Sequence, residues 1–446
     1  MQILKARELG KAKVENLLRK RAFDETELSP KIREANRKLF GEDLSPSELV
    51  RRIVGEVREK GDEAVLYYTK LIDKVECRPE DFLVTEEEYE TAKREADPEI
   101  VASLRRAAAN IRRYHEEQKP NSWMTYRSHG SLLGQAVIPL DRVGIYVPGG
   151  TAAYPSSVLM NAIPASVAGV GEILMMVPPK QGKINPYVLL AAKEAGVGRI
   201  YKIGGAQAIA AMAFGTKTIP RVDKITGPGN LFVTLAKKEV YGHCDIDMLA
   251  GPSEILILAD EAADPVYVAA DMLSQAEHDP LASSIVITDS EALAEKAAEE
   301  AEQQLAKLPR REIAGASIER NGLILVAETM EDAVEFANLS APEHLELLVR
   351  DPFHLLPKVR HAGAVFLGPY SPEPLGDYFA GPNHVLPTGG TARYYSVLNV
   401  ETFVKRTSVI SYTQDALKEA GEDIIRLAES EGLEAHANAI RLRMEG

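Results

Sequence analysis

The sequence lacks the features that mark several large classes of protein. It has only two cysteines, Cys77 and Cys244, which excludes a disulfide framework and a cysteine zinc site. No apolar stretch is long enough to span a bilayer, and residues 1–20 hold no continuous apolar segment of the kind a signal peptide requires. These absences agree with a reducing compartment, so the cytoplasm is the expected location.

Positive charge is also scarce. The chain has 52 Lys and Arg residues against 66 Asp and Glu residues, which gives a formal net charge of -14. Binding to nucleic acid phosphates or to an anionic membrane depends on a surplus of Lys and Arg, so we expect neither partner. The remaining composition is that of a globular protein, and 446 residues are enough for roughly two or three domains.

Hydrophobic periodicity divides the chain into regions. From Ser45 to Gln118 the apolar residues recur at helical spacing, and Ser45, Pro46 and Glu48 have the pattern of a capped helix start. Between Arg142 and Val240 short β-branched runs alternate with helices, and this alternation resumes after Gly251. An amphipathic helix is expected from about Asp415 to Arg443.

These patterns predict an α/β fold with two degenerate Rossmann-like domains, each a parallel-sheet α/β/α sandwich, a helical N-terminal region and a small helical C-terminal tail. Residues 1–40 are expected to form an N-terminal helical arm. Residues 41–141 and 246–386 are predicted to form a discontinuous first domain, residues 142–245 the second domain, and residues 387–446 the tail.

Three glycine-containing turns could bind an anion. Gly149-Gly150, Gly204-Gly205 and Gly227-Pro228-Gly229-Asn230 each follow an expected strand and precede an expected helix, whose free amides and dipole attract negative charge. None of them has the G-x-G-x-x-G spacing of a dinucleotide fingerprint. A tight turn between strand and helix therefore remains the simpler interpretation of each.

A candidate metal site begins with Gln275 and His278. Asp264 and Pro265 have the pattern of a helix start, and Pro280 cannot continue the helix, so Gln275 and His278 share a face. Two donors three residues apart can bind one metal ion. Such pairs are common on helices, however, and further donors must come from elsewhere in the chain.

Three further segments carry polar groups suited to chemistry. Glu343 and His344 stand side by side before an apolar run, where they could transfer protons or form a buried hydrogen-bonded pair. The segment from Leu375 to His384 crowds glycine, proline and polar residues together, which suits a shaped loop better than a helix. Glu431 and His436 belong to the terminal helix, where a solvated charged face is the simpler interpretation.

Seven of these segments together resemble one family, histidinol dehydrogenase. They are, in order, DRVGIYVPGG, GGAQAIAA, TGPGN, AGPSE, LSQAEHDP, SAPEHLEL and LGDYFAGPNHVLPT, and the resemblance covers essentially Arg142 to Val404. It implies a zinc-containing dehydrogenase that oxidises L-histidinol through L-histidinal to L-histidine with two molecules of NAD. It also implies a homodimer with intertwined tails, in which each tail completes the partner subunit's site.

The resemblance further implies a role for individual residues. One zinc ion per subunit would be held by Gln275, His278, Asp377 and His436, which would also contact the substrate. Glu343 and His344 would transfer protons. The substrate would also contact Ser253, His344, His384 and Glu431, and NAD would bind in the domain of residues 142–245 through Tyr146, Gln207 and Asn230.

This implied combination is chemically consistent. A glutamine oxygen, a carboxylate and two imidazoles are harder ligands than thiolates, so such a zinc can keep positions free for substrate nitrogen atoms. His344 would remove the alcohol proton, and Glu343 would activate the water that hydrates the aldehyde. Nothing near Cys244 suggests an activated thiolate, so a covalent thiohemiacetal is not expected there.

Two other function classes remain open at this point. A zinc hydrolase would use Gln275, His278 and Asp377 with the Glu343-His344 pair and would need no nicotinamide cofactor. A non-catalytic metabolite-binding protein would explain two α/β domains around a cleft. It gives no reason, however, for three separate clusters of histidine and carboxylate.

Overall fold

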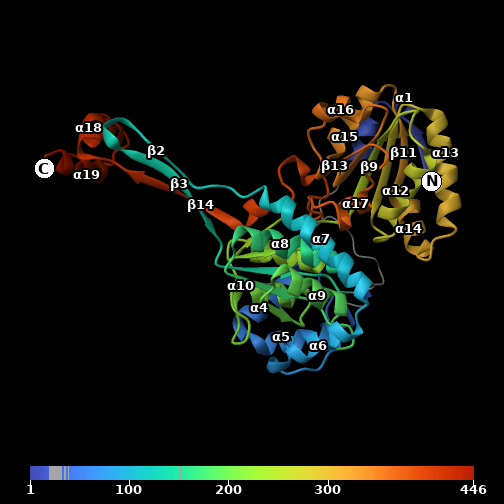
Figure 1. The fold of residues 1–446 in the computed structure, drawn as a ribbon, viewed down its shortest axis with the longest axis horizontal. Helices are drawn as coiled ribbons and strands as arrows, with labels where there is room; N and C mark the ends of the chain where they lie inside the picture. The colour runs from blue at the N-terminus through green and yellow to red at the C-terminus, as the bar shows by residue number, and fades with distance from the viewer. Residues whose placement is uncertain (20–32, 35–36, 39, 150–152, 446) are drawn as a thin grey trace.

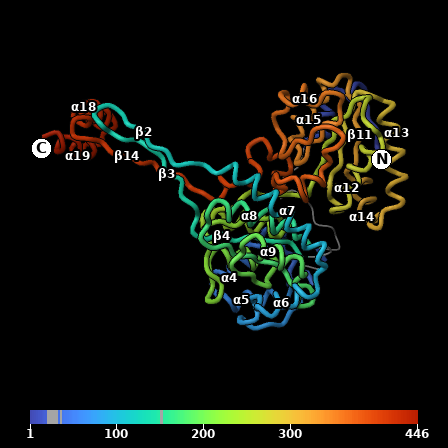
Figure 2. Tube along the Cα trace, viewed as in Figure 1, coloured from blue at the N-terminus to red at the C-terminus, as the bar shows by residue number. Residues whose placement is uncertain are grey.

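The computed structural model describes residues 1–19, 33–34, 37–38, 40–149 and 153–445. Two α/β bodies lie next to each other, and a long antiparallel ribbon projects away from both (Figure 1). The N-terminus belongs to one body, whereas the C-terminus lies at the far tip of the ribbon (Figure 2). Among the described helices, none combines the length and the apolar composition that a membrane span needs.

The first body is a six-stranded sheet in which every neighbouring pair is parallel. Alternate residues of its strands point to opposite faces, and each face is covered by helices that bury their apolar sides on it. The strands, in the order in which they pair, are β1 (Gln2–Lys5), β11 (Gly322–Val326), β10 (Ser283–Thr288), β9 (Glu254–Ala259), β12 (His344–Leu348) and β13 (Ala364–Leu367). One face packs against α1 (Ala6–Leu9), α2 (Lys11–Leu18), α15 (Met330–Ser340) and α16 (Pro352–Leu355), and the other against α12 (Pro265–Ala276), α13 (Glu291–Leu305) and α14 (Arg311–Asn321).

The second body is a five-stranded parallel sheet, also covered on both faces. Its strand order is β6 (Arg199–Tyr201), β5 (Glu172–Met176), β4 (Arg142–Tyr146), β7 (Lys224–Thr226) and β8 (Asp245–Ile246). One face packs against α4 (Pro46–Lys60), α5 (Asp62–Tyr68), α10 (Gly205–Phe214) and α11 (Leu231–Val240). The other face packs against α6 (Glu86–Glu95), α7 (Pro98–Glu116), α8 (Pro155–Ala168) and α9 (Pro186–Ala195). The predicted α/β class with two parallel sheets is therefore confirmed.

The projecting ribbon joins segments that are far apart in the sequence. Strand β3 (Leu132–Pro139) pairs antiparallel with β2 (Trp123–Tyr126) on one side and with β14 (Val404–Ser411) on the other. Helices α18 (Gln414–Ser430) and α19 (Glu434–Met444) pack on each other at the tip of the ribbon (Figure 1). The terminal region thus contains a strand and two helices, where one long helix was predicted.

The predicted domain boundaries need correction. The helices between Pro46 and Glu116 pack on the five-stranded sheet, whereas the prediction grouped residues 41–141 with residues 246–386. Residues 1–40 were predicted as a helical arm, yet Gln2–Lys5 forms an edge strand of the six-stranded sheet. Residues 20–32, 35–36 and 39 of that arm lie outside the described part of the chain. Both differences arise because contacts between distant segments determine which sheet an element joins, and hydrophobic periodicity does not encode these contacts.

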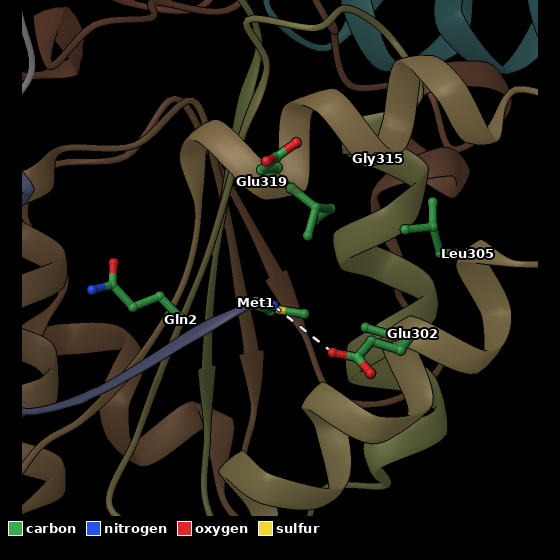
Figure 3. A pocket seen from close by; sticks show the side chains of 8 residues that line it. Met1, Gln2, Glu302, Leu305, Gly315 and Glu319 are labelled. Carbon is green, nitrogen blue, oxygen red and sulfur yellow. Dashed lines mark ion pairs between the residues drawn. The ribbon is translucent and has the colours of Figure 1, made fainter.

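A small hollow lies at the edge of the six-stranded body, between α13 and α14 (Figure 3). It measures about 440 Å³, and the Met1 amino group lies 3.9 Å from a Glu302 carboxylate oxygen inside it. Its lining is otherwise mostly aliphatic and includes no histidine. None of the predicted site residues lines this hollow.

Candidate active site

A larger pocket of about 800 Å³ is lined by residues from both bodies. In the five-stranded sheet the strand order reverses between β4 and β7, and the loops after these two strands contribute Pro148 and Gly227 to the pocket. Ligands commonly bind at such a reversal, outside the carboxyl ends of the strands. The six-stranded sheet borders the same pocket with the amino ends of its strands β9 and β12. These ends contribute Ser253 and His344.

Gln275 and His278 both line this pocket, as the sequence predicted. The Asp264 side chain caps α12 by accepting a hydrogen bond from the Val266 amide at 2.9 Å, and the helix ends at Ala276. His278 therefore lies in the turn after the helix. Gln275 is fully buried, and neither its side-chain oxygen nor its nitrogen has a hydrogen-bond partner among the described residues.

Asp377 reaches the same place from a short helix, α17 (Glu373–Tyr378). The prediction treated Leu375 to His384 as a loop, which is wrong for its first turn because proline is compatible with the start of a helix. One donor atom each from His278, Glu373 and Asp377 lies within 4.8 Å of the others. Burial raises the pKa of Asp377 to about 7 and that of Glu373 to about 8.

These residues fit a divalent metal ion. Buried carboxylates without a cation beside them and a buried amide with unpaired atoms are unfavourable unless a ligand satisfies them. The oxygen and imidazole donors are those that zinc accepts in catalytic sites. Gln275, His278 and Asp377 would supply three protein donors, and Glu373 adds a carboxylate that was not predicted.

The geometry fixes the protonation state of the buried His344 ring. Its Nδ1 lies 3.1 Å from the backbone carbonyl of Glu254, and because a carbonyl can only accept, Nδ1 must carry the hydrogen. The lone pair is then on Nε2, which is buried, has no hydrogen-bond partner in the described part of the chain and lies 3.8 Å from an Asp377 oxygen. Burial lowers the pKa of His344 to about 3, so the ring is neutral at physiological pH. His344 can therefore accept a proton through Nε2.

Glu343 lies beside His344 and is buried to a similar extent. One of its carboxylate oxygens accepts the Glu254 amide at 2.8 Å and lies 3.6 Å from Nδ1 of His344. Burial raises the pKa of Glu343 well above its usual value, which makes the carboxylate a stronger base. The pair thus combines two bases with different environments in one pocket.

His384 lines the pocket from the segment after α17. Its Nδ1 lies 3.0 Å from the Asp377 backbone carbonyl, so the hydrogen is on Nδ1, and its Nε2 lies 3.4 Å from the Ser157 hydroxyl. Burial lowers the pKa of His384 to about 4. Neutral His384 therefore has its unprotonated Nε2 next to the Ser157 hydroxyl, and both residues line the pocket.

Of the three residues predicted to contact NAD, only Asn230 belongs to the pocket lining. Asn230 lines the pocket, where its side chain caps α11. The Tyr146 hydroxyl instead accepts the Gly205 amide at 3.1 Å, and the Gln207 amide donates to Asp73 at 3.2 Å. Both side chains are buried and neither belongs to the pocket lining. Gly150, from the first glycine turn, lies outside the described residues.

The loop that carries Asn230 is held rigidly. Gly227 has a φ of 111°, and a Cβ there would lie 2.1 Å from the Tyr146 carbonyl oxygen, so only glycine fits. The Gly227 amide donates to Asp247 at 2.8 Å, and its carbonyl accepts from Lys237 at 3.0 Å. Lys237 and Asp247 form a buried ion pair beneath the loop. This support was not predicted, because the two residues are ten positions apart and separated by a turn.

Glu431 and His436 lie far from the pocket of their own chain. Both are exposed, Glu431 at the end of α18 and His436 on α19, at the tip of the projecting ribbon (Figure 1). Neither belongs to the pocket lining. Within one chain, the structure brings together Ser253, Gln275, His278, Glu343, His344, Asp377 and His384, but not the two tail residues.

Comparisons with known proteins point in one direction. A family model described as histidinol dehydrogenase matches residues 40–444. A histidinol dehydrogenase of Heliobacterium mobile is 56% identical over 405 residues, which are 91% of this chain and 95% of that protein. One of Bacillus subtilis (strain 168) is 58% identical over 395 residues, covering 88% and 92% of the two chains. The crystal structure of histidinol dehydrogenase from Elizabethkingia anophelis has a TM-score of 0.91 and 36% identity, with 100% of this chain and 98% of that chain covered.

Proposed function

The chain belongs to the histidinol dehydrogenase family, and we propose that the pocket of Glu343, His344 and the metal donors is where it oxidises L-histidinol. The chain is an NAD-dependent oxidoreductase that catalyses the final steps of histidine biosynthesis, from L-histidinol through L-histidinal to L-histidine. The observation that carries the assignment to this pocket is the free Nε2 of a neutral, buried His344 beside three candidate metal donors.

The two oxidations need different proton transfers, and the pocket offers a base for each. His344 accepts the alcohol proton at Nε2 in the first step, because its Nδ1 hydrogen is committed to the Glu254 carbonyl. Glu343 removes a proton from the water that adds to the aldehyde, and the hydrate is then oxidised to the acid. Asn230 would help to hold NAD at its side of the pocket, and bound NAD would supply the hydride acceptor for both oxidations.

The metal donors orient the substrate for these transfers. Bound zinc would supply a Lewis-acidic centre that holds the substrate's nitrogen atoms, and Gln275, His278 and Asp377 would provide its donors in this chain. Ser253 and His384 add polar contacts to the lining. Enclosing both bases in one pocket keeps the aldehyde near Glu343 between the steps.

His436 is proposed to reach this pocket from a second subunit. It belongs to α19 at the end of the ribbon, which projects away from both bodies of the chain (Figure 2). The ribbon and tail expose large apolar side chains, including Trp123, Tyr126, Ile410 and Leu427. A homodimer in which each tail covers the partner would bury these side chains and bring His436 to the zinc and Glu431 to the substrate.

We also propose that the enzyme works in the cytoplasm. Cys77 and Cys244 are both free thiols. Burial raises the pKa of Cys244 to about 12, which keeps it protonated and unreactive. A reducing compartment suits this state, and water rather than a thiolate remains the nucleophile for the aldehyde.

Removing the metal is expected to abolish NADH formation from histidinol and NAD while the fold survives. The six-stranded and five-stranded bodies have their own hydrophobic cores, so a metal bound between α12 and α17 is not needed to fold them. Chelated enzyme would be compared with untreated and zinc-restored enzyme by NADH absorbance and by circular dichroism. Full activity in the metal-free protein, or its wholesale unfolding, would contradict this role.

A further inference from the structure

Two buried carboxylates, Glu346 and Glu373, take no part in the proton transfers described above. Glu346 lies on β12, two residues after His344, and is fully buried. Glu373 is the first residue of α17, one helical turn before Asp377, and its exposed fraction is 1%. Neither carboxylate forms an ion pair with Lys or Arg among the described residues.

The first contact ties β12 to α17. The backbone amide of Glu373 donates to Glu346 Oε1 at 2.7 Å, so a carboxylate occupies the amino end of the helix that carries Asp377. Glu346 thereby satisfies one of the backbone amides that a helix leaves without a partner at its amino end. The strand that begins at His344 is thereby linked to the helix that positions Asp377.

The second contact ties α12 to α17. The Ser274 hydroxyl lies 3.0 Å from Glu373 Oε2 and also within 2.9 Å of the Asp271 carbonyl. Ser274 directly precedes Gln275 on α12. The Glu373 side chain therefore bridges the two elements that carry the donors Gln275, His278 and Asp377.

The remaining oxygen of Glu373 faces the donors themselves. Oε1 is buried, has no hydrogen-bond partner among the described residues, and lies 4.0 Å from Nε2 of His278. Together with Asp377 it completes the group whose donor atoms lie within 4.8 Å of one another. A buried, unpaired carboxylate oxygen is costly to the fold on its own, so its compensation must come from what binds there.

We propose that Glu373 is a positioning residue of the metal site, which holds His278 and Asp377 in converging orientations and adds negative charge beside the cation. The proposal rests on the zinc centre proposed above. Carboxylates that support metal ligands in this way typically contribute about 10- to 100-fold in metal affinity. Glu373→Gln keeps the shape of the side chain but removes its charge, so we expect zinc binding to weaken by about that factor.

The test measures zinc affinity directly rather than activity. Metal-free full-length protein is titrated with zinc in competition with a chromophoric chelator, and the melting temperature of the metal-free protein is recorded in parallel. The variants are Glu373→Gln, Ser274→Ala and Glu335→Gln. Ser274→Ala removes the bridge between α12 and Glu373 together with the contact of the same hydroxyl to the Asp271 carbonyl, and Glu335→Gln removes a carboxylate exposed on α15 of the same body. Glu335→Gln is the control, because it makes the same change of charge as Glu373→Gln.

The expected result is a zinc Kd raised about 10- to 100-fold in Glu373→Gln, raised less in Ser274→Ala and unchanged in Glu335→Gln. The metal-free melting temperature of Glu373→Gln is expected to lie close to that of the wild type, because glutamine has the same shape and fills the same buried position. An unchanged zinc Kd in Glu373→Gln would overturn the proposal. If Glu373→Gln does not fold, the zinc Kd of Ser274→Ala is the deciding measurement. A zinc Kd in Ser274→Ala equal to that of the wild type would then overturn the proposal. Wild-type protein that binds no zinc would instead refute the zinc centre itself.

Discussion

Replacing His344 with asparagine is expected to slow the first hydride transfer from histidinol by about 10²- to 10⁴-fold. His344 is the neutral, buried side chain whose free Nε2 opens into the pocket, and asparagine offers no comparable base. The asparagine amide can still donate to the Glu254 carbonyl, so the local structure is expected to survive. Stopped-flow measurement of NADH formation in the first turnover gives the rate directly.

Replacing Glu343 with glutamine is expected to slow mainly the second step, the oxidation of the aldehyde. Glu343→Gln should impair the oxidation of added histidinal more than the first transfer from histidinol, because in the proposed mechanism Glu343 activates the water that hydrates the aldehyde. The glutamine oxygen can still accept the Glu254 amide that Glu343 accepts at 2.8 Å. Loss at one step with retention at the other would separate the two roles.

Two controls exclude general effects of the substitutions. His354→Asn changes an exposed histidine on α16, and Glu335→Gln changes an exposed carboxylate on α15, so both are expected to behave like the wild type. Equal losses of activity with histidinol and with histidinal in both Glu343→Gln and His344→Asn would contradict the assignment of one base to each step. The pair would then act as one unit in both steps.

Mixing two inactive variants is expected to restore activity. His278→Ala damages the metal site in the body of the chain, and His436→Ala damages the tail that lies away from it. If each tail serves the partner subunit, a heterodimer has one site with both lesions and one site with neither. Equal mixing with free subunit exchange then restores about a quarter of the wild-type activity, because half of the dimers contain one intact site.

The same mixture tests the alternative arrangement. If the tail folded back onto its own chain, every site in the heterodimer would carry one lesion, and activity would stay at the level of the parents. Native mass spectrometry of differently tagged chains would verify that heterodimers have formed. Verified heterodimers without activity would exclude the exchange of tails.

Local patterns predicted much of the fold because they reflect local physics. The start of α12 at Asp264 and Pro265 and the alternation of strands and helices after Arg142 depend on capping and periodicity, which are visible in sequence. The packing of residues 46–116 on the five-stranded sheet was missed, because an amphipathic helix does not say which apolar surface it covers. The pairing of β3 with β14 joins residues more than 260 positions apart and has no local signal.

The residues of the candidate site also divide into those that the sequence predicted and those that it did not. The structure brings to one pocket five residues that were all predicted as site residues: Gln275, His278, Glu343, His344 and Asp377. Glu373 was missed because Pro372 and Pro374 hid the helical spacing that places it one turn before Asp377. The role predicted for His436 stays a prediction, because this residue lies on α19 outside the pocket lining of its own chain and the proposed site requires a second subunit.

The most direct test is the amount of NADH formed from a limiting amount of L-histidinol with excess NAD. One pocket that holds both bases predicts two molecules of NADH and one of L-histidine for each histidinol consumed, with no histidinal captured by an aldehyde trap. Zinc-loaded wild-type enzyme is used, and His344→Asn serves as the negative control. One molecule of NADH per histidinol with free histidinal accumulating, or no NADH at all, would contradict a four-electron oxidation completed at this site.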